Sequence, residues 1–341
     1  MIEPLFKIRH QGYYGFINNL GEISIEPQYI YAEAFHNGFS RVRLNDRLVH
    51  LDQLGRLLVK KLYQYVGKYE SGLAPVQLVR YWGYIDQKGN PFTLIQYDEA
   101  QEFSENLACV RLEGKVGYIN TEGTLLFSPR FAEGSAFKNN IAAVITESEE
   151  PAYINLRGDV LFHTNYDFNG AFNSTLAIIS SGQKWGLMDQ NGKTILPPQF
   201  DILEDLNDLK FHDNLIAASK DGLFGFIDLN GKLVIPHQYE YVSNFSDGFA
   251  AFHNDEGIFG FLDKEGKVVI EPTYEEVGDF VNGYAPVSLN DKWGYIDKQG
   301  NIIVKPVFDI ATSFENGLAM IEIKGNMAYI NTKFDVVWQE E

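Results

Sequence analysis

Hydrophobic and polar residues alternate along short segments of this chain, and turn-forming residues separate these segments. At 293–297 the order Trp-Gly-Tyr-Ile-Asp places larger polar or aromatic side chains at every second position, which is typical of a β-strand with one aromatic face. The stretch from Asp297 to Gly300 supplies a side-chain acceptor and a glycine that can adopt positive φ, so it predicts a hairpin into a second strand at 302–304. Because proline lacks a backbone N–H, Pro306 is expected to end that strand.

A third strand is expected after a connector and a further turn. Asn316 and Gly317 favour a reverse turn, and the hydrophobic residues at 318–321 begin the strand that leads into the following unit. Each unit is therefore predicted to be a three-stranded antiparallel meander.

The same unit recurs along the whole chain with a period close to 34 residues. The nine residues 292–300 are closely repeated at 81–89 and 184–192, and looser copies keep the same frame. Spacings between aligned positions are 34, 34, 34, 35, 34, 39, 35, 34 and 34 residues. The longest spacing reflects about five extra residues around 204–210, which are expected to form an excursion from the connector. The aligned positions are Gly15, Val49, Gly83, Gly117, Ala152, Gly186, Gly225, Gly260, Gly294 and Ala328.

These residues resemble the bacterial WG repeat, also described as the KWG repeat. Its unit is similar to (K)WGYID-x-x-G-x-hydrophobic-P-x-(Y/F)-(D/E), followed by F-x-x-G-L-A-x-V. The resemblance covers essentially the whole chain. It implies a bacterial recognition module with no shared catalytic chemistry, since a fold family does not by itself define an activity.

The predicted fold class is all-β, a tandem array of ten three-stranded meanders. The chain begins in a third-strand sequence and finishes in a second-strand one, so ten complete meanders fit and none is split between the two ends. An open, curved β-solenoid is favoured on this ground, and a closed β-propeller is the alternative, because whole units can also close without exchanging a strand. A single array is expected over 1–341, with units at approximately 5–34, 35–68, 69–102, 103–136, 137–171, 172–210, 211–244, 245–279, 280–313 and 314–341.

Cysteine content and charge narrow the classes of function. The single Cys109 provides neither an internal disulfide nor a thiolate zinc site, and its place in a strand pattern indicates an inert residue. The net charge of −18 disfavours nucleic acid and anionic membrane as partners, because phosphate groups require clustered Lys and Arg. The N-terminal residues do not resemble a secretion signal, and no apolar run is long enough to span a membrane, so a soluble cytoplasmic protein is expected.

The aromatic and acidic residues that recur in the units are candidates for ligand stacking and metal binding. Structural roles within the repeat are favoured for both. Trp82, Trp185 and Trp293 are candidate stacking platforms for a sugar, but other apolar residues fill the same position elsewhere, which favours packing between units. The aspartates that open the hairpins, such as Asp297, are replaced by asparagine in some copies, so a turn acceptor is favoured over a metal ligand. No nucleophile–base set, metal-ligand spacing or phosphate-binding glycine loop stands out, and neither a catalytic residue nor a cofactor is predicted.

Basic residues depart from the repeat near the N-terminus. Residues 1–68 carry nine Lys and Arg against six Asp and Glu, whereas the remainder carries nineteen against forty. If successive units stack, these side chains form a basic strip, which serves either as a solubilising cap or as a docking site for an acidic protein surface. The strip occupies two positions of the third strand that are mostly small, neutral or acidic in later units, and it consists of Lys7, Arg9, Arg41, Arg43 and Arg111.

The function predicted from these features is a non-enzymatic protein-binding scaffold, in which positions that depart from the repeat set the specificity. An inhibitor or immunity-type partner of another bacterial protein is one concrete version. The alternative is a small-ligand or glycan binder that uses Trp82, Trp185 and Trp293, and it requires ring faces open to solvent.

Overall fold

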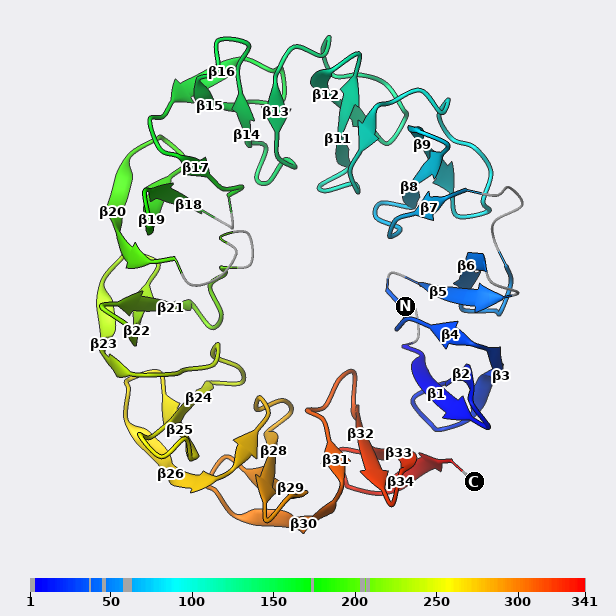
Figure 1. The fold of residues 1–341 in the computed structure, drawn as a ribbon, viewed down its shortest axis with the longest axis vertical. Coiled ribbons are helices and arrows are strands. Elements are labelled where there is room, and N and C mark those ends of the chain that lie inside the picture. Colours follow the sequence, from blue (N-terminus) through cyan, green and yellow to red (C-terminus); the bar gives the residue numbers. More distant parts are fainter. Residues whose placement is uncertain are drawn as a thin grey trace. The chain divides into compact units, whose positions relative to one another are not determined.

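The computed structural model describes residues 4–36, 38–44, 47–57, 63–172, 175–202, 206 and 209–340. These residues form ten small antiparallel sheets of three or four strands, which follow one another in chain order, and no helix occurs among them (Figure 1). The all-β class and the ten tandem units expected from the sequence are therefore confirmed. We number the repeats by their sheets, so that the first repeat contains β1–β3 and the tenth contains β31–β34.

The first five sheets comprise β1 (Phe6–His10), β2 (Tyr13–Ile17) and β3 (Ile23–Tyr29); β4 (Tyr31–Ala32), β5 (Phe39–Leu44) and β6 (Arg47–Asp52); β7 (Tyr65–Val66), β8 (Leu73–Leu78) and β9 (Tyr81–Asp86); β10 (Glu99–Ala100), β11 (Leu107–Leu112) and β12 (Lys115–Asn120); and β13 (Glu133–Gly134), β14 (Ala142–Ile145), β15 (Pro151–Ile154) and β16 (Val160–His163). The other five comprise β17 (Phe168–Asn169), β18 (Leu176–Ser181), β19 (Lys184–Asp189) and β20 (Thr194–Asp201); β21 (Leu215–Lys220), β22 (Leu223–Asp228) and β23 (Leu233–Tyr239); β24 (Phe249–His253), β25 (Phe259–Asp263) and β26 (Val268–Tyr274); β27 (Glu276–Val277), β28 (Tyr284–Leu289), β29 (Lys292–Asp297) and β30 (Ile302–Phe308); and β31 (Ile310–Ala311), β32 (Leu318–Ile323), β33 (Asn326–Asn331) and β34 (Val336–Gln339).

The outer strand of the ninth sheet corrects one expectation. β30 continues through Pro306 to Phe308, so the prediction that this proline ends the strand is wrong. The ladder between β29 and β30 shifts register on either side of Tyr295, and such a bulge accommodates a residue that cannot donate a hydrogen bond. The sequence pattern also missed the two-residue strands, such as β31, that precede several meanders.

The glycine of the repeat makes this bulged approach possible. A Cβ atom on Gly294 would lie 2.4 Å from the carbonyl oxygen of Val304, so only glycine allows β30 to come this close. In the fifth and tenth repeats, alanine replaces this glycine and pairs directly with the outer strand, as Ala152 with His163 and Ala328 with Gln339. Those two outer strands contain no proline. Glycine and the bulge around proline are therefore linked features of one unit.

Successive sheets are joined by apolar packing and by a recurrent tyrosine. One core cluster combines Phe261 and Ile270 of the eighth repeat with Val287 and Ile296 of the ninth. Buried tyrosine hydroxyls donate to a backbone carbonyl 17 residues further on, in the next repeat, which satisfies both polar groups inside the core. These bonds are Tyr84 to Gln101 at 2.6 Å, Tyr118 to Ser135 at 2.8 Å, Tyr153 to Gly170 at 2.8 Å and Tyr295 to Thr312 at 2.9 Å.

The acidic position of the hairpin turn has the structural role expected from the sequence. In Asp297, Oδ1 accepts the backbone N–H groups of Gln299 and Asn301, both at 2.9 Å. Asn120 makes the equivalent pair of bonds, to Glu122 and Thr124, at 3.0 Å each. Because an amide oxygen and a carboxylate oxygen serve equally, the position selects a turn acceptor, and the prediction is confirmed.

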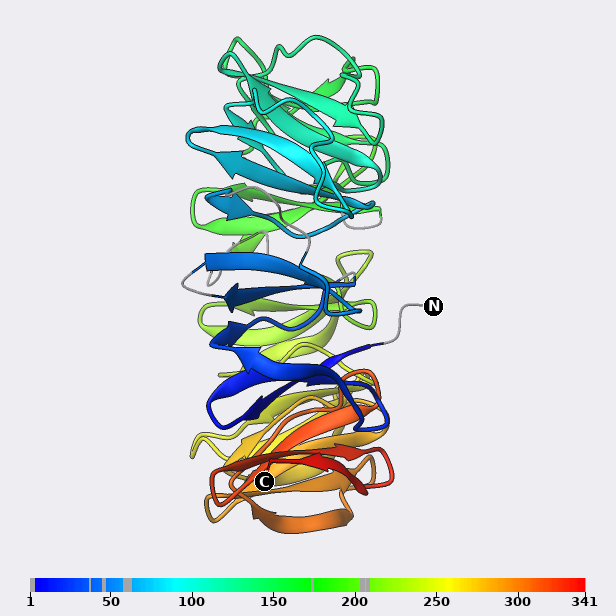
Figure 2. The same ribbon diagram turned by 90° about the vertical axis from the view of Figure 1, so that its right-hand side faces the viewer.

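Contacts divide the chain into two compact units. The first holds Tyr29–Gln199, and the second holds residues 4–28 together with residues 200–340. Within the second unit the first sheet packs against the last, and these blue and red sheets lie side by side in both views (Figure 1, Figure 2). This packing joins whole sheets, because the described strands of each sheet are consecutive in the sequence. Its apolar cluster consists of Phe6, Ile8, Ile17 and Leu318, with Tyr329, Val337 and Trp338 against it.

The contact between these two ends resembles the packing of interior neighbours but differs from it by one residue. The turn glycine of the ninth repeat, Gly300, sits over Ile270 of the eighth, with 3.4 Å from an added Cβ to the nearest side-chain atom. Gly21 of the first repeat instead lies against the backbone of Val337 in the tenth, one residue before Trp338, which is the counterpart of Ile270, and an added Cβ would lie only 1.9 Å from the Val337 carbonyl oxygen. An open array, which the sequence favours, does not require the first and last sheets to be in contact.

Candidate interaction surface

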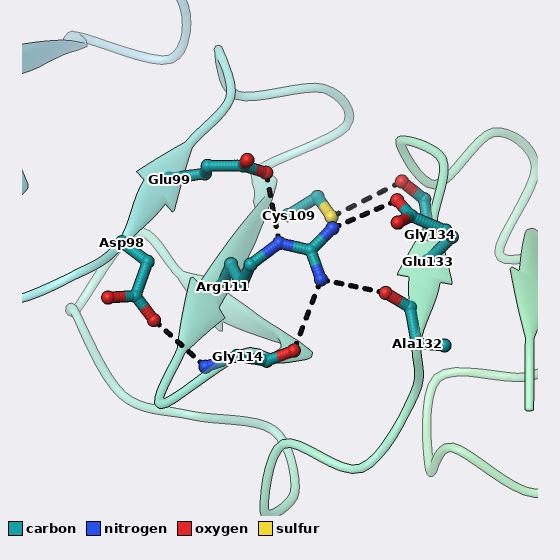
Figure 3. A network of polar contacts seen from close by, with 8 residues as sticks. All are labelled: Asp98, Glu99, Cys109, Arg111, Gly114, Ala132, Glu133 and Gly134. Atoms are coloured by element: carbon teal, nitrogen blue, oxygen red, sulfur yellow. Dashed lines mark hydrogen bonds and ion pairs between the residues drawn. The ribbon is translucent and has the colours of Figure 1, made fainter. Parts of the chain in front are cut away.

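Arg111 of the basic strip is held by four acceptors within the first unit (Figure 3). Its guanidinium donates to Glu99 at 3.1 Å, to Glu133 at 2.9 Å, and to the carbonyl oxygens of Gly114 at 3.2 Å and Ala132 at 2.7 Å. Only 17% of the side chain is exposed. Because Ala132 and Glu133 belong to the next repeat, Arg111 joins two repeats, and a partner would have to displace these bonds.

Arg41 is also paired inside the protein. It donates to both carboxylate oxygens of Glu33, at 2.6 and 2.7 Å, in the fork geometry that suits a guanidinium. Partial burial raises the pKa of Glu33, but the hydrogen bonds and charge of Arg41 outweigh it, so the pKa lies below its ordinary value. Arg41 is therefore neutralised by its own repeat.

The other three basic residues are less engaged. Lys7 lies with Nζ 5.4 Å from the ring centre of Tyr14, and Arg43 lies 5.8 Å from that of Tyr31. Arg9 makes a long ion pair with Glu340 at 3.8 Å and is 43% exposed. Lys7 and Arg9 belong to the second unit, whereas Arg41, Arg43 and Arg111 belong to the first. Within the strip, Lys7 and Arg43 have no ion pair among the described residues.

His50 replaces the buried tyrosine in the second repeat. It lies opposite Arg41 in the β5–β6 ladder, is 3% exposed and keeps a hydrogen bond to the backbone of Gly67, which is 17 residues further on. Burial, and next the positive charge of Arg41, lower the pKa of His50 to about 4. The imidazole therefore fills the tyrosine position as a neutral group near pH 7.

The three tryptophans proposed as stacking platforms differ in exposure. Trp185 is 1% exposed and has no ring face open to a ligand. Trp293 is half-buried against the core of the last two repeats. Trp82 is also half-buried, but it meets Tyr65 edge-on at 5.3 Å and lines a surface groove. A ladder with one platform in each repeat is therefore absent at these positions, because Trp185 packs between sheets.

The groove beside Trp82 is a feature that the sequence did not reveal. It has a volume of about 640 Å³, is open to solvent, and crosses the third, fourth and fifth repeats within the first unit. This volume is within the usual range of ligand sites, and residues that differ between repeats form much of its wall. The lining residues are Tyr65, Glu70, Ser71, Pro75, Trp82, Ala100, Gln101, Glu102, Phe103, Ser104, Glu105, Ala136 and Lys138.

Chemically reactive side chains do not gather in the part of the chain that the structure describes. No group of three or more His, Cys, Asp or Glu residues is arranged there to hold a metal ion. Cys109 is buried beside the carbonyl of Gly134, and burial raises the pKa of its thiol to about 12, as expected for an inert strand residue (Figure 3). The same described residues contain no helix with the length and apolar character needed to cross a membrane.

Comparison with known families accounts for the repeated geometry. The model of the WG containing repeat matches residues 14–47, 51–78, 82–115, 117–147, 185–224, 224–256, 259–293 and 293–326. This chain belongs to the WG-repeat family. The unmatched stretch 148–184 includes the WG-repeat unit in which Ala152 replaces the glycine and the outer strand pairs without proline. No curated protein matches the sequence.

Solved structures align with this chain at low sequence identity. A eukaryotic initiation factor aligns with a TM-score of 0.54 and 12% identity, over 88% of this chain and 94% of that one. The computationally designed Ika8 protein aligns with a TM-score of 0.45 and 14% identity, over 88% and 98% of the two chains. BamB from Moraxella catarrhalis gives a TM-score of 0.37 and 10% identity, over 87% and 96%. At such identity, the first of these supports a repeated β-sheet fold and nothing about function.

Proposed function

We propose that this WG-repeat chain is a non-enzymatic protein-binding scaffold. The observation that carries the proposal is the open groove beside Trp82, which crosses three repeats and combines repeat-consensus residues such as Trp82 and Phe103 with residues that vary between repeats, such as Glu102 and Lys138. In repeat proteins, such variable surface positions on a constant framework are where partners bind. Tyr295, Asp297 and Arg111 each have a structural role, in a junction or a turn.

Two finer versions of this function concern the choice of partner. An acidic partner surface would bind to residues of the basic strip, for which Lys7 in the second unit and Arg43 in the first are each better candidates than Arg41 and Arg111, which are already paired. Inhibition of another bacterial protein is a more specific physiological role for such a protein-binding scaffold. Glycan binding is the alternative, and among the three tryptophans proposed for it, the Trp82 ring at the groove gives it most support.

Affinity capture from a lysate of the source organism tests the scaffold function. The native chain, a Lys7→Glu/Arg43→Glu variant and a Trp82→Phe/Glu102→Gln variant serve as baits, and retained proteins are identified and quantified by mass spectrometry. We expect one protein in stoichiometric amount on the native bait and its loss from one of the two variants. Failure of all three folded baits to retain any protein would contradict the proposal and favour the glycan alternative.

A further inference from the structure

The charges of the groove favour a cationic occupant. Three carboxylates, from Glu70, Glu102 and Glu105, line it against the single ammonium of Lys138. Glu102 crosses between repeats and is oriented by the backbone N–H of Lys68, which Oε1 accepts at 2.8 Å. Oε1 of Glu70 lies 2.9 Å from Nε2 of His36, and the Glu105 side chain is exposed. The net charge of this wall is therefore negative, on a chain whose net charge is −18.

The aromatic wall has the same preference. Tyr65 is 42% exposed and meets Trp82 edge-on at 5.3 Å. The protein already places a guanidinium near this wall, since Arg41 lies 5.9 Å from the ring centre of Tyr65. A ring face attracts a cation electrostatically, and carboxylates beside it add hydrogen-bond acceptors in the fork arrangement that arginine uses.

We propose that this groove binds an extended, Arg- or Lys-bearing segment of a partner protein. The inference deepens the scaffold function proposed above and rests on it. The lining residues come from three successive repeats, between Tyr65 and Lys138, so an occupant that fills the groove spans more than one side chain. A basic side chain lies against Trp82 and Tyr65, and its donors reach Glu102 and Glu105.

Direct binding to the purified full-length chain tests this assignment. The probe is a fluorescein-labelled peptide of alternating Arg and Gly, and the comparison peptide has Glu in place of Arg. We expect anisotropy to show binding of the Arg peptide, weakened at least about tenfold by Glu102→Gln/Glu105→Gln, since loss of a single charge-assisted hydrogen bond lowers affinity by about that factor. Intrinsic tryptophan fluorescence should change when unlabelled Arg peptide is added, and the change should disappear in Trp82→Phe, which keeps an aromatic residue found at this position in other repeats.

A matched variant separates the groove from general attraction to an acidic protein. Glu113→Gln/Glu149→Gln removes two exposed carboxylates outside the groove and changes the net charge by the same amount. It should leave the affinity within about twofold of native, because exposed charges at a distance are screened by salt. Equal weakening by both double variants, or equal binding of the Glu peptide, would overturn the proposal.

Other results would identify a different occupant of the groove, or would show whether the groove assignment or the scaffold function is wrong. A response of Trp82 to cellohexaose but not to the Arg peptide would overturn the proposal in favour of a glycan, and a response to spermidine alone would overturn it in favour of a small cation. If the capture experiment yields a partner that the Trp82→Phe/Glu102→Gln bait retains fully, the scaffold function stands and the groove assignment fails. If no protein is captured and no peptide binds, both fail.

Discussion

Two junctions in the second unit use the same tyrosine position with different acceptors. Between the ninth and tenth repeats, Tyr295 donates to the carbonyl of Thr312, directly after the short strand β31. Between the tenth and first repeats, Tyr329 donates to the carbonyl of Lys7, within β1 itself, at 2.8 Å. Among the described residues, the first sheet consists of β1–β3 alone, with no short strand before β1. A junction therefore requires an acceptor opposite the tyrosine, and different strands of the neighbouring sheet can supply it.

The two junctions also differ in how the chain supports them. At the interior junction the backbone runs directly from β30 into β31, whereas the end junction joins β1–β3 to β31–β34 through side-chain packing and few polar contacts. Because no adjacent backbone holds the two end sheets together, substitutions there should separate them more easily than equivalent substitutions inside the unit.

Substitution of Gly21 should have the largest effect. Gly21→Ala places a Cβ against the Val337 carbonyl and also forces alanine into φ +83, so we expect a loss of unfolding free energy on the order of 3 kcal/mol. Gly12→Ala, at φ +82 with no neighbour within 4 Å, isolates the backbone strain and should lose about 1 kcal/mol. Urea denaturation of both variants measures the difference. Equal losses would mean that the end junction is loose in solution.

Acidification should act on the second repeat, where His50 stands in for tyrosine. The pKa of His50 is lowered from 6.5 to about 4 in the folded protein, so between these values the unfolded chain binds the additional proton. Stability therefore falls as the pH drops from above 6.5 towards 4, by about 3 kcal/mol in total from this group.

Urea midpoints measured across this pH range test the effect on a variant that restores the repeat residue. His50→Tyr should remove this part of the pH dependence, because tyrosine is neutral throughout the range. A pH profile identical in the two proteins would show that other groups dominate.

Removal of the junction hydroxyls should have the smallest effect. Tyr295→Phe leaves the Thr312 carbonyl without its donor beside a fully buried ring, and about 2 kcal/mol should be lost. Tyr329→Phe should lose about 1 kcal/mol, because Tyr329 is only half-buried and water can replace the donor. Hydrogen exchange should nevertheless accelerate in β1 for Tyr329→Phe and in β31–β32 for Tyr295→Phe. A larger loss for Tyr329→Phe than for Tyr295→Phe would contradict the argument from burial of the hydroxyl.

The local rules of the unit were largely predictable from the sequence, whereas its long-range pairs were not. The turn role of Asp297 follows from its replacement by asparagine in other copies, which requires no knowledge of neighbours. The pairing of Arg41 with Glu33 and of Arg111 with Glu133 depends on connectors whose course the strand pattern does not define. For the same reason the strip was identified as basic, although two of its members are neutralised internally.

The candidate site illustrates the same limit. Trp82 was singled out with Trp185 because both occupy one repeat position, but exposure depends on the neighbouring repeat. Trp82 lies beside Tyr65 and an open groove, while Trp185 is enclosed. A groove formed by three repeats is a property of their stacking, which no single unit of the sequence encodes.

The constant offset of 17 residues between the interior junction tyrosines and their acceptors restricts where the chain can gain length. An insertion between Tyr118 and Ser135 would carry the acceptor out of phase with its hydroxyl. In the sixth repeat the same position is Leu187, which has no hydroxyl to satisfy, and the 39-residue spacing follows it. Insertions, and the new binding specificities that they introduce, are therefore tolerated most readily at junctions where another residue replaces the tyrosine.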